Sequence, residues 1–192
     1  MEIVFASNNK NKISELQSML PEHITILSLE SNGCLEDIPE TAATIEGNAI
    51  IKANYVTEKY GYDCFADDTG LEVEALNGAP GVYSARYAGE QKNADDNMNK
   101  LLEALSHTNN RNAQFKTVIA LNYRGQQQLF TGYAKGTITL NKTGHGGFGY
   151  DPIFQPDNYT TTFAEISPEI KNRISHRGKA TQKLLAHLNN LR

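Results

Sequence analysis

The stretch Cys64-Phe65-Ala66-Asp67-Asp68-Thr69-Gly70 determines the fold that this sequence predicts. Its apolar start, residues 64–66, predicts a short buried strand, and the acids, hydroxyl and glycine that follow are typical of a turn. In an α/β protein, acids at the end of a buried strand lie where the sheet opens its ligand crevice. Because Asp67 and Asp68 repel each other, we expect a divalent cation, a lysine or an arginine beside them. The alternative is that they only begin a loop and cap the next element.

The segments around this stretch predict alternating strands and helices. Apolar runs predict strands at residues 3–6, 24–29, 71–76, 115–123 and 129–140, the last two as a hairpin. Helical spacing predicts helices at residues 10–20, 44–60, 93–106, 168–174 and 178–191. This order predicts an α/β protein with three α/β/α layers and a mixed central sheet.

Length and composition argue against several classes of protein. A chain of 192 residues forms one large domain or two small lobes that share a core. The net charge of −4 and the lack of a basic run disfavour nucleic-acid binding, and no segment reaches the ~20 apolar residues of a membrane span. Cys34 and Cys64 are too few for a disulfide framework or a zinc site, and no signal peptide is visible. We therefore expect a cytoplasmic protein that binds neither nucleic acid nor membrane.

A polar segment, Ser7-Asn8-Asn9-Lys10-Asn11-Lys12, joins the first expected strand to the first expected helix. The start of a helix offers free backbone N–H groups and a positive dipole end, so it can bind an anion. Lysines are unusual there, because the first turn normally favours acids. We therefore expect Lys10 and Lys12 to face an external anion, with a solvated polar turn as the alternative. The Walker pattern is absent.

A glycine-rich loop, residues 144–149, formally matches the dinucleotide fingerprint, but Pro152 follows too soon for the helix that this fingerprint opens. We interpret it instead as a flexible loop whose bare backbone can approach a ligand closely. Phe148 and Tyr150 within it can stack on a purine, and the alternative is that they pack in the core.

Three basic side chains lie just before the last expected helix. Lys171, His176 and Arg177 indicate recognition of an anion or a carbonyl, although a surface pair is the alternative. Glu40 precedes the second expected helix and is either a metal ligand brought to Asp68 or a loop acid near a helix start. Acids for a cation, lysines for phosphates and an aromatic glycine loop for a base together describe a Mg²⁺–nucleotide site.

Six blocks of this sequence, in the same order and at compatible spacing, resemble the Ham1/inosine triphosphate pyrophosphatase family end to end. The blocks are Ser7–Lys12 with Glu15, residues 39–49, residues 66–71, residues 78–87, residues 147–154 and residues 175–178. The departures are small, since Thr69 stands where serine is common and Ser7 where threonine is.

The resemblance implies an enzyme that removes non-canonical purine nucleotides. It would hydrolyse ITP, dITP and XTP to the monophosphate and pyrophosphate, with Mg²⁺ as cofactor. It also implies one elongated ITPase-like domain over residues 1–192, with two lobes, a central active-site cleft and a homodimeric assembly.

By position, the resemblance also assigns roles to residues of this chain. Phosphate binding falls to Ser7, Asn8, Asn9, Lys10, Asn11 and Lys12. Metal binding falls to Glu40 and Asp68, with Asp68 also the proton acceptor, and Thr69 contacts the substrate. The base and sugar would be held by Phe148, Gly149, Tyr150 and Asp151, with Phe148 stacking. The base and its 6-oxygen would be faced by Lys171, His176 and Arg177.

The expected reaction is attack of water on the α-phosphorus, with Asp68 kept at a low pKa beside the metal. Arg177 is the expected donor to the 6-oxygen, because a required hydrogen bond discriminates against adenine better than an apolar slot does. Two alternatives stay open. One is a Maf-like pyrophosphatase acting on dTTP, UTP or modified pyrimidines, and the other is a nucleotide-binding protein without hydrolysis, against which the intact acids argue.

Overall fold

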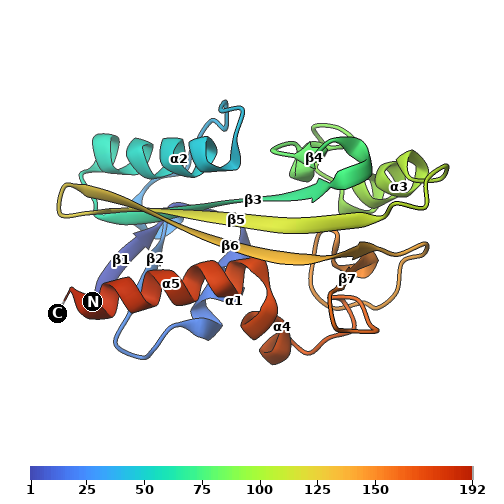
Figure 1. The fold of residues 1–192 in the computed structure, drawn as a ribbon. Coiled ribbons are helices and arrows are strands. Elements are labelled where there is room, and N and C mark those ends of the chain that lie inside the picture. The colour runs from blue at the N-terminus through green and yellow to red at the C-terminus, as the bar shows by residue number, and fades with distance from the viewer. Residues whose placement is uncertain (192) are drawn as a thin grey trace. The chain divides into compact units, whose positions relative to one another are not determined.

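The computed structural model describes residues 1–191 and contains a mixed sheet flanked by helices (Figure 1). The strand order is β2-β1-β3-β5-β6-β7, with β4 paired to β3. β1 runs parallel to β2 and β3, whereas β4 pairs antiparallel with β3 and β7 antiparallel with β6. The predicted α/β class with a mixed sheet is confirmed.

The elements have the following bounds. The strands are β1 (Glu2–Phe5), β2 (Thr25–Ser28), β3 (Cys64–Val73), β4 (Pro80–Gly81), β5 (Asn112–Tyr123), β6 (Gln126–Ile138) and β7 (Phe154–Pro156). The α-helices are α1 (Lys10–Met19), α2 (Ile45–Tyr60), α3 (Ala94–Ala104), α4 (Pro168–Ile174) and α5 (His176–Asn190). None of the helices in the described part of the chain has the length and apolar content that a membrane span requires.

The chain divides into two compact units. The first unit contains residues 1–68, residues 117–132 and the chain from Arg177 onward, and the second contains residues 69–116 and 133–176. The long strands β3, β5 and β6 therefore each contribute residues to both units. Each unit has its own hydrophobic core.

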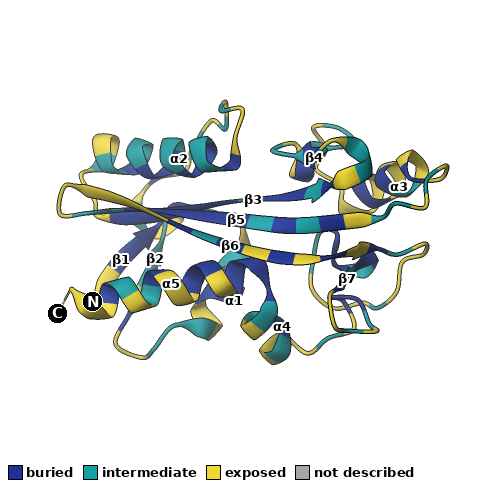
Figure 2. Cartoon of the chain, viewed as in Figure 1, coloured by how far each residue is buried: buried dark blue, intermediate teal, exposed yellow. Residues whose placement is uncertain are grey.

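The first unit has three layers. α2 covers one face of its strands, and α1 and α5 cover the other (Figure 1). Three strand side chains, Phe5 of β1, Phe65 of β3 and Ile119 of β5, pack there in one core with Leu16 of α1 and Leu184 of α5. Figure 2 shows this burial, with β1, β3 and the part of β5 in this unit mostly dark blue, whereas residues 126–129 at the start of β6 are exposed. The apolar periodicity of the sequence thus directs one face of each helix to the sheet.

Local signals in the sequence set the ends of α2. The Thr44 hydroxyl accepts from the Gly47 N–H at 3.0 Å, which caps the first turn. Gly61 adopts a left-handed conformation with φ of 73° and ends the helix, as the sequence predicts.

The second unit is built around aromatic side chains. Phe115 contacts Phe154 edge to face at 4.7 Å between ring centroids, and Phe163 packs against both. α3 adds Met98 and Leu101 to this core. The unit also holds the glycine-rich loop and α4, which carry most of the residues assigned to the base.

Two predictions about element bounds are wrong. The expected turn at residues 67–70 is absent, because β3 runs without interruption from Cys64 to Val73 and residues 74–76 form a short 3₁₀ helix. An extended backbone accommodates Asp67 and Asp68 here because both carboxylates find partners inside the protein. The last helix also starts earlier than expected, so that His176 and Arg177 lie in its first turn.

Candidate active site

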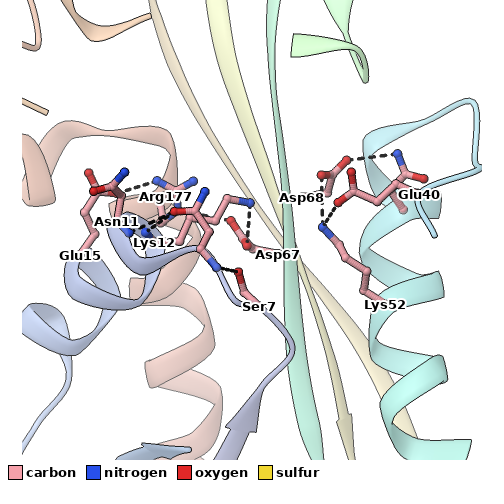
Figure 3. Close-up of polar contacts among 11 residues, drawn as sticks. Ser7, Asn11, Lys12, Glu15, Glu40, Lys52, Asp67, Asp68 and Arg177 are labelled. Carbon is pink, nitrogen blue, oxygen red and sulfur yellow. Dashed lines mark hydrogen bonds and ion pairs between the residues drawn. The ribbon is translucent and has the colours of Figure 1, made fainter. Parts of the chain in front are cut away.

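Asp67 and Asp68 point to opposite faces of β3. Successive side chains of a strand alternate in direction, so two adjacent residues cannot share a face. Figure 3 shows the result, with Asp67 turned toward Lys12 and Arg177 and Asp68 turned toward Lys52 and Glu40. The first unit therefore presents one carboxylate on the α1/α5 side of its sheet and one on the α2 side.

On the α1/α5 side, Asp67 binds two cations. Lys12 Nζ lies 3.0 Å from Asp67 Oδ1, and Arg177 Nε lies 3.3 Å from Asp67 Oδ2. Arg177 also donates from Nη1 to Glu15 Oε2 at 2.5 Å. Asp67 and Arg177 are almost completely buried, so this network forms a fixed ionic core beneath the start of α1.

The charges explain how these groups stay ionised. Burial alone would raise the pKa of Asp67, but Lys12, Arg177 and Lys52 outweigh it and hold that pKa well below its usual range. Burial lowers the pKa of Lys12, and the neighbouring cations Lys52 and Arg177 lower it further against the pull of Asp67. The expected positive partner beside the acid pair is therefore present as protein side chains.

On the α2 side, Asp68 meets one lysine and one amide. Lys52 Nζ lies 3.3 Å from Asp68 Oδ1, and Asn48 Nδ2 donates to Asp68 Oδ2 at 3.4 Å. Burial raises the pKa of Asp68, and Glu40 and Asp67 add to this effect. The low pKa expected for Asp68 concerns the metal-bound state and stays a prediction.

Glu40 and Asp68 are suited to a hard divalent cation such as Mg²⁺. Lys52 Nζ, which lies 3.3 Å from Asp68, is also 2.6 Å from Glu40 Oε1, so one positive centre already reaches both carboxylates. Mg²⁺ takes one or two protein carboxylates together with phosphate oxygens. No group of three or more His, Cys, Asp or Glu side chains within residues 1–191 is arranged to hold a metal. A cation here would therefore need ligands from the substrate or from water.

Residues 7–12, which the sequence predicts to bind an external anion, also make contacts within the protein. Asn9 caps α1, and its Oδ1 accepts from the N–H groups of Asn11 and Lys12 at 3.0 and 3.2 Å. The Asn9 N–H donates to the Ser7 hydroxyl at 3.1 Å. Two of the helix-start donors expected to be free are thus satisfied internally, and the charge of Lys12 is balanced by Asp67. Asn8 and Lys10 are exposed.

In the second unit, Asp151 organises the glycine-rich loop. Its Oδ2 accepts from Lys171 Nζ at 2.6 Å and from the Phe148 N–H at 2.9 Å. Lys171 Nζ also lies 5.0 Å from the centre of the Phe148 ring. Gly147 has φ of +67°, and a Cβ on it would lie 2.0 Å from the same Asp151 oxygen. Only glycine therefore fits at this position, and the loop is more fixed than the sequence predicts.

The other predicted residues of the second unit differ in exposure. His176 is buried and stacks on Phe115 at 4.4 Å between centroids. Tyr150 is buried, and its hydroxyl donates to the Ser84 carbonyl at 2.7 Å. Thr69 is half-buried in β3. Phe148, Asp151 and Lys171 are thus brought together within this unit, while the Tyr150 hydroxyl is occupied by the core.

Comparison with known proteins identifies the family of the chain. The model of the Ham1 family matches residues 3–187. The chain belongs to the Ham1 family. It is 75% identical over 185 residues to a protein of Flavobacterium johnsoniae named dITP/XTP pyrophosphatase, with 96% of both chains covered. The family that the sequence blocks predict is confirmed.

Solved structures of Ham1 proteins support the fold independently. The Ham1 protein of Staphylococcus aureus has a TM-score of 0.91 to this chain at 41% identity and full coverage of both chains. A HAM1 protein of Coxiella burnetii has a TM-score of 0.91 at 40% identity, with 99% of each chain covered.

Sequence reasoning missed two polar residues of this Ham1 chain, Asn48 and Lys52 on α2. Both are buried, and both contact Asp68. They lie four residues apart, beside the buried residues Ala49 and Ala53 of the apolar face of this helix. A lysine within such a face must be paired or placed for function, and this signal would have identified Lys52.

Proposed function

We propose that this chain hydrolyses the non-canonical purine nucleoside triphosphates ITP, dITP and XTP to the monophosphate and pyrophosphate, removing them from the nucleotide pool. The name of the Flavobacterium johnsoniae relative, dITP/XTP pyrophosphatase, supports this choice of substrates. The observation that carries the proposal is the pair of carboxylates on β3, which face opposite ways and each have a lysine of their own.

The chemistry follows from these two faces. A water oxygen attacks the α-phosphorus, the bond from that phosphorus to the bridging oxygen breaks, and pyrophosphate leaves with the electron pair. Asp68 accepts the proton of the water late in the transfer. Lys12, held by Asp67, presents positive charge to the phosphates. Phosphoryl transfer of this kind depends mostly on positioning and electrostatic stabilisation.

Mg²⁺ is the proposed cofactor, held by Glu40 and Asp68. When bound, the ion neutralises charge on the phosphate oxygens. Its arrival would also change the contacts of Lys52, which lies against both carboxylates. Removing divalent ions with EDTA should abolish turnover, and adding Mg²⁺ should restore it, as measured by pyrophosphate release. Unchanged turnover in EDTA would rule out the metal.

We propose that the second set of residues, Phe148, Asp151 and Lys171, holds the base and sugar of the same nucleotide. Phe148 offers a ring for stacking, worth about 1–3 kcal/mol, and its loop is fixed by Asp151. Thr69, Gly149 and Tyr150 remain proposed substrate contacts, and His176 and Arg177 remain proposed neighbours of the 6-oxygen. Ser7, Asn8, Asn9, Lys10 and Asn11 remain the proposed phosphate segment.

The deciding experiment is hydrolysis with Mg²⁺ in ¹⁸O-labelled water. We expect dITP and XTP to give pyrophosphate, with the label in the monophosphate because water attacks the α-phosphorus. A preference for dTTP would favour the Maf-like alternative instead. Binding of dITP without hydrolysis would favour the non-catalytic one, and label in the pyrophosphate would contradict attack on the α-phosphorus.

The role of Arg177 as the donor to the 6-oxygen of the base must be tested with a substitution that keeps its positive charge. Removing the Arg177 side chain would take a buried cation from Asp67 and Glu15, so Arg177→Ala would confuse selectivity with stability. Arg177→Lys keeps the charge but changes the donors. We expect it to lower the preference for dITP over dATP, as a ratio of kcat/KM, by about tenfold or more. Arg173→Lys, at an exposed position, is the control. An unchanged ratio of kcat/KM for dITP over dATP in Arg177→Lys would show that Arg177 does not recognise the 6-oxygen.

The assembly is proposed from the family resemblance, and the location from the composition of the sequence. We propose a homodimer in the cytoplasm. Size-exclusion chromatography with light scattering should give twice the mass of one chain, and a monomer mass at micromolar concentration would contradict the dimer.

A further inference from the structure

The segment that carries Glu40 is attached to α2 along one stripe of the helix. This segment, residues 33–44, is called the Glu40 loop, and it lies between the 3₁₀ helix Glu30–Asn32 and the start of α2. Its partners on α2 recur at intervals of four, three and four residues, which places them on one helix face. They are Asn48, Lys52, Tyr55 and Lys59.

The strongest attachment is at Glu36. Its Oε1 accepts from the hydroxyls of Tyr55 and Tyr60 at 2.7 and 2.8 Å and from the ammonium of Lys59. Lys59 Nζ also donates to the Tyr55 hydroxyl at 3.0 Å. Three donors from the last turns of α2 thus converge on one carboxylate oxygen. They lower the pKa of Glu36 to about 2, so that it is ionised at neutral pH.

A second attachment lies on the other side of Glu40. The Ala42 N–H donates to Asn48 Oδ1 at 2.9 Å, and Asn48 in turn donates to Asp68. Glu40 therefore lies between two points of attachment, opposite Lys52. The same helix that holds Asp68 by Asn48 and Lys52 also holds both ends of the loop.

Chain geometry makes the position of Glu36 matter for Glu40. On α2, Tyr55 and Lys52 lie about 4.5 Å apart along the axis, whereas four extended residues can span about 13 Å. Without an attachment at Glu36, the loop has enough slack to move the Glu40 carboxylate by several ångströms. A displacement of that size would remove it from reach of a cation shared with Asp68.

We infer that Glu36 is a positioning residue, which clamps the Glu40 loop to α2 and so places the Glu40 carboxylate beside Asp68. The inference rests on the proposed function, in which Glu40 and Asp68 hold the metal. Glu36 acts on the metal site through the loop.

The first measurement needs neither metal nor substrate. Hydrogen exchange of the Ala42 amide in the metal-free protein should be about tenfold faster or more in Glu36→Ala, because the loop opens more often. The Gly61 amide, which donates to the Thr57 carbonyl at the end of α2, should keep its rate. Glu58→Ala removes an exposed carboxylate from the same helix and serves as the matched control. Unchanged Ala42 exchange, or an equal acceleration at Gly61, would overturn the clamp.

The second measurement concerns the metal. At saturating dITP, Glu36→Ala should need about fivefold more Mg²⁺ for half-maximal turnover, while kcat at saturating Mg²⁺ should fall less than about threefold. Glu36→Gln keeps an acceptor for the tyrosines but loses the charge that attracts Lys59. Its Mg²⁺ requirement should therefore lie between those of the wild type and Glu36→Ala. A loosened loop with an unchanged Mg²⁺ requirement would refute the positioning role.

The two measurements separate this inference from the proposed function. If the wild-type protein does not hydrolyse dITP, the proposed function fails and the positioning role fails with it, whereas the exchange of Ala42 still decides whether Glu36 clamps the loop. If the wild-type protein is active and Glu36→Ala matches Glu58→Ala in both measurements, only the inference fails.

Discussion

Asp67 and Asp68 are the same residue type at adjacent positions of one strand, yet their surroundings differ in kind. Asp67 has no exposed side-chain surface and binds Lys12 and Arg177, so it is ionised and fixed. Asp68 keeps 8% of its side chain exposed, binds one lysine that it shares with Glu40, and has a raised pKa. One carboxylate holds cations in place, and the other is available for chemistry.

The comparison shows that charge partners, not residue type, separate a structural acid from a reactive one. Two neighbouring cations hold Asp67 in its ionised form and keep its pKa far below neutral pH. A group that burial destabilises in its charged form gains from a proton or a metal. Substitutions on the two faces of β3 test this division.

Asp68→Asn should have the largest effect, on catalysis. The amide cannot accept a proton and is a poor metal ligand, so kcat for dITP should fall by about a thousandfold or more. Release of pyrophosphate measures the effect, and circular dichroism should show an unchanged fold. The exposed Asp157→Asn is the control. Normal turnover in Asp68→Asn would remove Asp68 from the mechanism.

Asp67→Asn should instead act on stability. It leaves the buried Arg177 and the half-buried Lys12 with less compensation, so the free energy of unfolding should fall by about 3 kcal/mol. Asp68→Asn in metal-free protein should change it by less than about 1 kcal/mol, because burial already disfavours the charged form there. Urea denaturation measures both. Equal losses in the two variants would end the distinction between the two faces.

Glu15→Gln tests the outer part of the Asp67 network. Arg177 would lose one charged partner but keep Asp67, so we expect a loss of about 1.5 kcal/mol in the free energy of unfolding. The exposed Glu22→Gln should have no measurable effect. A loss in Glu15→Gln as large as that in Asp67→Asn would mean that the network is anchored at Glu15.

The smallest effect concerns the α2 side and pH. Glu36 has a pKa of about 2 in the folded protein against an ordinary value of 4.5. A lowered pKa of an acid stabilises the fold above the unfolded value and loses that effect as the pH falls through the folded value. The stability difference between wild type and Glu36→Gln should therefore be constant above about pH 5 and shrink toward pH 2. A constant difference down to pH 2 would contradict the ion pair with Lys59.

Much of the fold follows from the sequence because the signals are local. The apolar spacing of residues 44–60, the capping side chain of Asn93 and the glycine at position 61 act within one or two helical turns. The alternation of strands and helices then restricts the sheet to a few arrangements. These predictions agree with the structure to within a few residues.

The site could be predicted only in part, because its contacts join distant residues. The acids of β3 indicated a nearby cation, but the sequence does not show which face each acid takes or which lysine it meets. Asp67-Asp68-Thr69-Gly70 has turn composition, and it is a strand here because partners on α1, α2 and α5 satisfy its polar groups. Lys52 was missed because a buried lysine has meaning only once its carboxylates are located.

The alternating side-chain directions along β3 also limit which insertions and deletions this strand can tolerate. Removing or adding one residue between Cys64 and Ala66 would slip the strand and exchange the directions of the two carboxylates. The ionic core would then receive the reactive acid, and α2 would receive the structural one. Length variation should therefore be tolerated in the surrounding loops and eliminated by selection within this strand.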